Sequence, residues 1–184
     1  MVMLREQMER HVDFEPARVE RNGQAYVETY NFVREELERY LARYHELDQI
    51  NQTARLLRDQ IDALIRRYHE YVIEGKIKAH YREVGLKPKD AVDFEHVIPA
   101  RSVRNLLIDG VWTIDQALNS PTCLIRRNQH RKLKDMKLSK HTPNKWLFWQ
   151  RYAGLKLSIE TYDGTAVDQS AWDFEQHCRY FNIA

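Results

Sequence analysis

Cysteine is scarce in this chain of 184 residues, which contains only two, Cys123 and Cys178, far apart in the sequence. Without a CxxC pair, the sequence argues against a zinc ribbon and a disulfide framework, and it fits a reducing compartment. No apolar run approaches the roughly 20 residues that a membrane-spanning helix needs. The N-terminal residues also lack the apolar core and the small-residue cleavage site of a secretory signal. These absences predict a cytoplasmic protein with no membrane partner.

Glycine and proline are sparse as well, with six and five residues. No glycine-rich loop is followed by Lys-Ser or Lys-Thr, so an NTPase is not expected. Neither glycine nor proline occurs between Ala25 and Glu74, and this segment carries a helical apolar pattern. The pattern forms two stripes, Tyr26, Tyr30, Val33, Leu37, Tyr40, Tyr44 and Leu47, then Ile50, Ala54, Leu57, Ile61, Leu64, Tyr68 and Tyr71.

The two stripes join irregularly, because Leu47 to Ile50 is a second consecutive step of three. Such a dropped residue either bends one long helix or marks a turn between two helices. Asp48, Asn51 and Thr53 are all able to cap a new helix. We therefore expect a helical hairpin that turns near these residues, with a single bent helix as the alternative. The aromatic stripes are expected to form core or a dimer seam.

The rest of the chain alternates short apolar runs with turn residues. Residues 1–24 predict a short helix followed by an irregular lead-in, and residues 75–90 predict a linker. The later expected elements are a strand over 91–98, helices over 102–108 and 112–118, a strand over 123–125, a helix with His130, a helix over 145–155, a strand over 157–162 and a helix over 170–181. His45 and His69 are expected to be structural.

The formal net charge of +2 conceals a basic segment. Between Gln116 and Ile159 the sequence has a single acid, Asp135, against ten basic residues. This concentration favours a nucleic-acid partner, because phosphate neutralisation releases counterions. The alternative is a solvated helix face whose acids lie elsewhere in the fold. The residues predicted to contact nucleic acid are Arg126, Arg127, Arg131, Lys132, Lys134 and Lys137.

An acid and a histidine stand side by side in the run Asp-Phe-Glu-His-Val-Ile-Pro, which ends at Pro99. At the end of a short strand, Glu95 and His96 can supply a metal ligand and a general base. Neighbours in a strand point to opposite faces, so both serve one site only if the strand ends or bulges there. The turn at Pro99 is expected to provide that bend, and His130 is expected to complete the metal site from the opposite side.

The segments Glu-His-Val-Ile-Pro and Cys-Leu-Ile-Arg-Arg-Asn-Gln-His-Arg-Lys-Leu together resemble the ββα-metal site of the HNH (His-Asn-His) endonucleases. The resemblance covers residues 92–135. It implies that Glu95 is the first metal ligand, His96 the general base and His130 the second metal ligand. The implied cofactor is a divalent metal, with Mg²⁺ expected and Mn²⁺ or Zn²⁺ as alternatives.

The middle asparagine of this family usually begins the second strand, where the chain has Pro121. Asn119, just outside that position, is the preferred candidate, and Asn128 on the helix side is the alternative. The implied role of Asn119 is catalytic support, since its side chain would orient the loop that bears His96 through hydrogen bonds.

The sequence thus predicts an α+β, mostly α, protein in two parts. Residues 1–78 form an N-terminal helical region, a long hairpin or arm through which a homodimer could form. Residues 79–184 form an HNH-like nuclease domain with a helical C-terminal cover. The resemblance implies a metal-dependent endonuclease that hydrolyses DNA phosphodiester bonds, with RNA not excluded. The alternative is a non-catalytic nucleic-acid-binding or assembly protein with a helical dimerisation arm.

Overall fold

A computed structural model describes the backbone of residues 16–48, 51–70 and 79–183, with side chains from Val27 onward in these ranges. The described residues form an α+β fold with a four-stranded mixed sheet. Helix α2 (Pro16–His45) already includes Gly23, so the irregular lead-in predicted up to residue 24 is wrong. The short helix predicted before it lies in residues 1–15, outside the described ranges. Every helix within these ranges is too short or too polar to cross a lipid bilayer.

The N-terminal part is a helical hairpin of α2 and α3 (Gln52–Tyr68), which pack against each other. Asn51 caps α3, since its side-chain oxygen accepts a hydrogen bond from the Thr53 nitrogen at 2.8 Å. The helices pack through the predicted stripes, whose buried members are Tyr30, Val33, Leu37, Tyr44, Ala54, Leu57, Ile61 and Tyr68. The prediction of a hairpin is therefore confirmed, and its stripes pack within one chain.

The sheet joins strands that are distant in the sequence, in the order β2-β3-β1-β4. β2 (Val92–His96) pairs antiparallel with β3 (Thr122–Arg126) along its whole length. β1 (Tyr81–Glu83) runs parallel to β3 and antiparallel to β4 (Ile159–Thr161). The linker predicted over 75–90 is wrong at β1, because a strand of three residues is too short to show alternation in the sequence.

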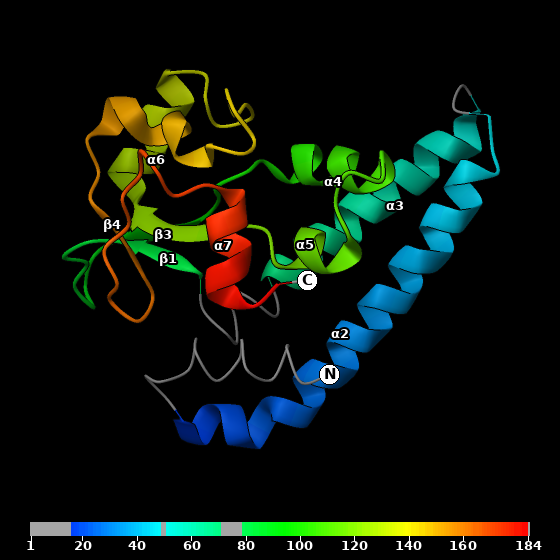
Figure 1. The fold of residues 1–184 in the computed structure, drawn as a ribbon, viewed down its shortest axis with the longest axis horizontal. Coiled ribbons are helices and arrows are strands. Elements are labelled where there is room, and N and C mark those ends of the chain that lie inside the picture. The colour runs from blue at the N-terminus through cyan, green and yellow to red at the C-terminus, as the bar shows by residue number, and fades with distance from the viewer. Residues whose placement is uncertain (1–15, 49–50, 71–78, 184) are drawn as a thin grey trace.

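Two short helices, α4 (Ala100–Ile108) and α5 (Ile114–Leu118), lie between the hairpin and the sheet (Figure 1). Thr113 caps α5 through a reciprocal capping box with Gln116, so the helix begins at Ile114 and not at Trp112. The buried side chains of these helices belong to one hydrophobic cluster that also includes the hairpin stripes and the sheet. The division into residues 1–78 and 79–184 stays a prediction, although this shared core ties the two parts together.

The helix predicted over 145–155 begins later and is wound more tightly. The Asn144 side-chain oxygen accepts the backbone N–H groups of Trp146 and Leu147, at 2.8 and 3.1 Å. Such a side-chain turn competes with helix formation. The helix that follows, η2 (Phe148–Leu155), is a 3₁₀ helix that buries Phe148 and Trp149.

The last helix, α7 (Phe174–Phe181), begins after Asp173, which caps it, and not at Ser170 as predicted. Its buried His177 has partners that the sequence did not indicate. Nε2 lies 2.8 Å from the Asn119 carbonyl oxygen, and Nδ1 lies 2.7 Å from the Tyr81 hydroxyl. Because a carbonyl only accepts, Nε2 carries the proton and Nδ1 accepts from Tyr81. These bonds fix α7 to the sheet and to the end of α5.

Candidate functional site

Alternation along β2 sorts its side chains onto the two faces of the strand. Asp93 and Glu95 point towards α6 (Arg127–Asp135), where both contact His130. Phe94 and His96 point to the other face, and His96 packs there against His69. Because α6 follows β3 without a connecting loop, the helix starts directly beside the first of these faces.

His130 bridges the two carboxylates of β2. Its Nδ1 lies 2.9 Å from Asp93 Oδ2, and its Nε2 lies 2.9 Å from Glu95 Oε2. The structure thus brings together the two predicted metal ligands, Glu95 and His130. The hydrogen bonds to Glu95 and then to Asp93 raise the pKa of His130 to about 9. Near neutral pH this imidazole is therefore protonated, and both ring nitrogens donate to carboxyl groups.

Arg151 holds the other oxygen of Glu95, at 2.5 Å, from a completely buried position in η2. Its guanidinium also donates to the carbonyl oxygens of His96 and Val97, at 2.6 and 2.9 Å. Further bonds go to the carbonyl oxygens of residues 138 and 139, at 2.7 and 2.9 Å. Arg151 thereby fixes both a predicted metal ligand and the backbone at the end of β2.

The donor set of this cluster suits a divalent cation. A carboxylate oxygen and an imidazole nitrogen are common ligands, and metal-bound histidines usually give their other nitrogen to a carboxylate. The residue types here fit that pattern, with Glu95 as the carboxylate, His130 as the imidazole and Asp93 on its other nitrogen. In the part of the chain that the structure describes, no group of three His, Cys, Asp or Glu side chains is placed to hold a metal by itself.

The structure does not bring His96 to this cluster. β2 keeps its pairing with β3 through His96, so the bend expected at Pro99 comes too late to turn the imidazole towards Glu95. The His96 ring centroid lies 5.0 Å from that of His69. Burial, and then the charges of His69 and Arg66, hold the pKa of His96 well below its ordinary value. His96 is thus a neutral imidazole across the strand from Glu95.

Asn119 makes contacts other than the predicted ones. Its side-chain nitrogen donates to the Asp115 carbonyl oxygen at 2.9 Å, which closes α5. The backbone after His96 is held instead by Arg151 and by Pro121, whose carbonyl oxygen accepts from the Val97 nitrogen at 3.0 Å. The alternative asparagine, Asn128, is exposed in the first turn of α6.

The six predicted nucleic-acid contacts divide into two groups. Arg126 pairs with Glu83 and, at 3.4 Å, with Asp90, and Arg127 pairs with Asp93 at 3.0 Å. These two arginines are therefore largely neutralised within the chain. The other four are exposed on α6 or directly after it: Arg131, Lys132, Lys134 and Lys137.

Two residues of the cluster, Asp93 and Arg151, were missed by sequence reasoning. Asp93 stands two residues before Glu95, so the period of a strand gives a signal that would have placed both on one face. Arg151 gives no such signal, because it stands in the sequence as one more cation of the basic segment. Cys123 is buried, and burial raises its pKa well above the ordinary value, so its thiol is inert.

Comparisons with protein-family models, with curated proteins and with solved structures found no match to this chain. The likeness to the HNH endonucleases therefore rests on the quoted motifs alone.

Proposed function

We propose that this protein is an HNH-like, divalent-metal-dependent endonuclease that hydrolyses DNA phosphodiester bonds. The observation that carries the proposal is the meeting of Glu95 and His130 at 2.9 Å, with Asp93 on the other nitrogen of the ring. The element order supports it as well, since the antiparallel pair of β2 and β3 leads directly into α6. This is the order that a ββα-metal unit requires.

Glu95 and His130 are the proposed ligands of the ion, with Mg²⁺ expected and Mn²⁺ or Zn²⁺ as alternatives. Because a histidine ligand must be neutral, the ion would have to displace a proton from His130. A bound ion would stabilise negative charge on the phosphate and on the leaving oxygen. The protein's own task is to position these ligands. Asp93 fixes the ring of His130, and Arg151 fixes the second oxygen of Glu95.

His96 is the proposed general base, because a neutral imidazole accepts a proton from water. Burial lowers its pKa, which keeps the ring neutral at cellular pH and also makes it a weaker base than an exposed histidine. Since its ring lies across β2 from Glu95, the substrate has to reach over the end of the strand to meet both residues.

DNA is the proposed substrate because the exposed cations lie on the same helix as His130. Contacts of Arg131, Lys132, Lys134 and Lys137 with phosphates would position the backbone without reading its sequence. Supercoiled DNA and a labelled RNA, tested side by side, distinguish the two nucleic acids.

Incubation of supercoiled plasmid with Mg²⁺, Mn²⁺ or EDTA tests the proposal. We expect nicking with either ion and none with EDTA. His96→Ala is expected to lower the rate by roughly 10²- to 10⁴-fold at every metal concentration. Glu95→Gln and His130→Ala are expected to regain part of their activity as the metal concentration rises.

The exposed His141 provides the matched control, because His141→Ala removes an imidazole from the same half of the chain without touching the cluster. Intact plasmid under all metal conditions, with the wild-type protein folded, would refute the proposal. Wild-type cleavage by His96→Ala would remove only the assignment of the base.

A non-catalytic nucleic-acid-binding protein is the second candidate, and the state of Glu95 favours it. Both oxygens of this carboxylate are bound by cations of the protein, one by Arg151 and one by His130. With His96 turned away, the same cluster can serve to fix α6 to the sheet. A gel shift of DNA that is unaffected by EDTA, without cleavage, would identify this function.

We propose a monomer in place of the homodimer expected through the N-terminal helices. The stripes that would form its seam pack inside the chain, so a dimer needs another face of the hairpin. The exposed Phe32 on α2 and Leu56 on α3 are its apolar candidates there.

A further inference from the structure

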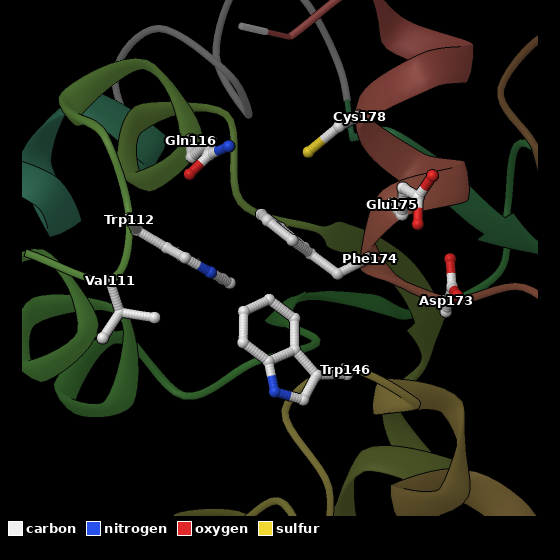
Figure 2. Close-up of a pocket in the computed structure, with 8 residues that line it drawn as sticks. All are labelled: Val111, Trp112, Gln116, Trp146, Asp173, Phe174, Glu175 and Cys178. Atoms are coloured by element: carbon white, nitrogen blue, oxygen red, sulfur yellow. The ribbon is translucent and has the colours of Figure 1, made fainter.

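A concave site away from Glu95 and His130 lies between the α4–α5 turn, the loop before η2 and the start of α7. It is a cavity of about 440 Å³, lined mainly by the aromatic residues Trp112, Trp146 and Phe174 and by the acids Asp173 and Glu175. Figure 2 shows the three rings gathered at its centre and both carboxylates on the α7 side. None of the residues assigned to the nuclease site lines this cavity.

The aromatic wall of the cavity is fixed in place. The Phe174 nitrogen donates to the Trp146 carbonyl oxygen at 2.9 Å, so the two segments that carry these rings are joined. Trp112 stacks on Phe174 with ring centroids 4.0 Å apart, and Trp146 meets Phe174 edge to face. Trp146 is nevertheless 49% exposed. A half-exposed indole held by the backbone at a cavity is a preformed surface for a ligand.

The charge of the cavity indicates the kind of ligand. Its lining contains two carboxylates and no lysine, arginine or histidine. Asp173 gives one oxygen to the Gln176 nitrogen as the cap of α7, and Glu175 lies 3.6 Å from Arg179 at the exposed rim. A cation over the ring faces would gain from both the aromatic quadrupoles and the carboxylates, whereas a phosphate would be repelled.

We propose that this cavity binds the guanidinium group of an arginine side chain presented by a peptide. A guanidinium is planar, so it stacks on an indole face and donates to a carboxylate in the same pose. A lysine ammonium is a compact, strongly hydrated charge that cannot stack in this way. The proposal is independent of the nuclease activity, since it uses none of the residues around Glu95.

Nuclear magnetic resonance of the full chain tests the proposal with the peptide acetyl-Gly-Gly-Arg-Gly-Gly-amide as the probe. We expect the indole N–H signals of Trp112 and Trp146 to shift on titration. The counterpart with citrulline, which has the same shape without the charge, is expected to bind at least about fivefold more weakly. The lysine counterpart is expected to lie between the two.

Two variants locate the binding. Trp146→Ala and Asp173→Asn are each expected to weaken binding of the arginine peptide about fivefold. Asparagine also caps helices, so Asp173→Asn removes the charge and keeps the start of α7. Asp59→Asn, at an exposed position on α3, is the matched control and should bind as the wild type does.

Absence of indole shifts with the arginine peptide would overturn the proposal, as would equal binding of the citrulline peptide. Equal binding of the lysine peptide would overturn the choice of guanidinium. Shifts of the same indole signals by adenosine monophosphate, and not by the peptide, would show that the cavity stacks a base instead.

Discussion

His69 is a buried histidine at the end of α3 whose environment favours its neutral form. Its Nε2 lies 3.0 Å from the Leu118 carbonyl oxygen, so this nitrogen carries the proton. Its other nitrogen is buried without a hydrogen-bond partner among the described residues. Burial lowers the pKa of His69 to about 4. This position agrees with the expectation that His69 is structural. Its lowered pKa also makes the stability of the fold depend on pH in the acid range.

The first prediction concerns the stability of the wild type below pH 6.5. Because the folded pKa of His69 is lowered, the unfolded chain binds a proton that the folded chain resists. Stability is therefore complete above pH 6.5 and falls as the pH drops towards 4. The expected loss from His69 alone is about 2 kcal/mol at pH 5. Urea unfolding at pH 7.5, 6 and 5 measures it.

A His69→Phe variant, which cannot titrate, is the control for this measurement. Its free energy of unfolding should be lower at pH 7.5, because Leu118 loses a donor, but it should fall less steeply with acid. Parallel pH profiles for the variant and the wild type would contradict the assignment.

Arg151 is a second residue whose substitution should have a large effect on the free energy of unfolding. Its side chain is completely buried, and its donors bind four backbone carbonyl oxygens and Glu95. A lysine has three donors and no planar fork, so it cannot satisfy this set.

We predict that Arg151→Lys lowers the free energy of unfolding by about 3 kcal/mol, because buried carbonyl oxygens lose their donors. Glu95→Gln, which leaves the carbonyl bonds of Arg151 in place, should cost less. Urea unfolding of both variants beside the wild type makes the comparison. A smaller loss for Arg151→Lys than for Glu95→Gln would show that the ion pair, and not the carbonyl network, dominates.

At the scale of the element, α6 carries different kinds of side chain on its two sides. Its inner side carries His130 and the buried Leu133, and its outer side carries exposed cations. Lys137, directly after the helix, adopts the left-handed conformation with φ of 60°. The Leu138 nitrogen then bonds back to the Leu133 carbonyl oxygen at 2.9 Å, which ends the helix and leaves the basic side chains on its solvent face.

The prediction for α6 is that a triple variant, Lys132→Glu, Lys134→Glu and Lys137→Glu, weakens binding to DNA of any sequence. Each lost phosphate contact should reduce the salt slope by about 0.9. Fluorescence anisotropy at several salt concentrations measures both effects. Lys87→Glu with Lys89→Glu, at exposed positions outside the basic segment, is the control. Equal weakening by this control would mean that net charge, and not α6, governs binding.

At the scale of the whole molecule, the hairpin serves as a wall of the core. Its stripes pack on each other, and α3 packs in turn on α4 and α5, in the same hydrophobic cluster as the sheet. The packing also places His69 of α3 against His96 of β2, so the hairpin contacts the strand that carries the candidate site. The hairpin is therefore part of the core and not an arm that stands free of it.

We therefore predict that the wild type sediments as a monomer of about 22.1 kDa at micromolar concentration. Leu37→Glu should destabilise the fold, because it buries a charge in the hairpin, and Phe32→Glu on the exposed face should not. A dimer that dissociates in the Phe32→Glu variant would instead establish a homodimer through the outer face of the hairpin.

The sequence alone determined the elements whose signals are local. The four-and-three spacing of apolar residues, with Asn51 as a cap, predicted the hairpin. Pro99 placed the end of β2 only approximately, since the strand stops at His96, and the capping of α5 by Thr113 is equally local. The order of strand, strand and helix, together with the resemblance of the two segments to the HNH motif, brought Glu95 and His130 into one hypothesis. These features depend on a few neighbouring residues, so their physics is visible in the chain itself.

Tertiary structure decided everything that depends on partners distant in the sequence. It revealed β1, which is a strand only because β3 and β4 supply its hydrogen bonds. It also placed Arg151 under Glu95, neutralised Arg126 with Glu83, and left His96 against the hairpin rather than beside His130. A charged or aromatic residue gives the same signal in the sequence whether its side chain contacts solvent or a buried carboxylate. Only packing determines its neighbours.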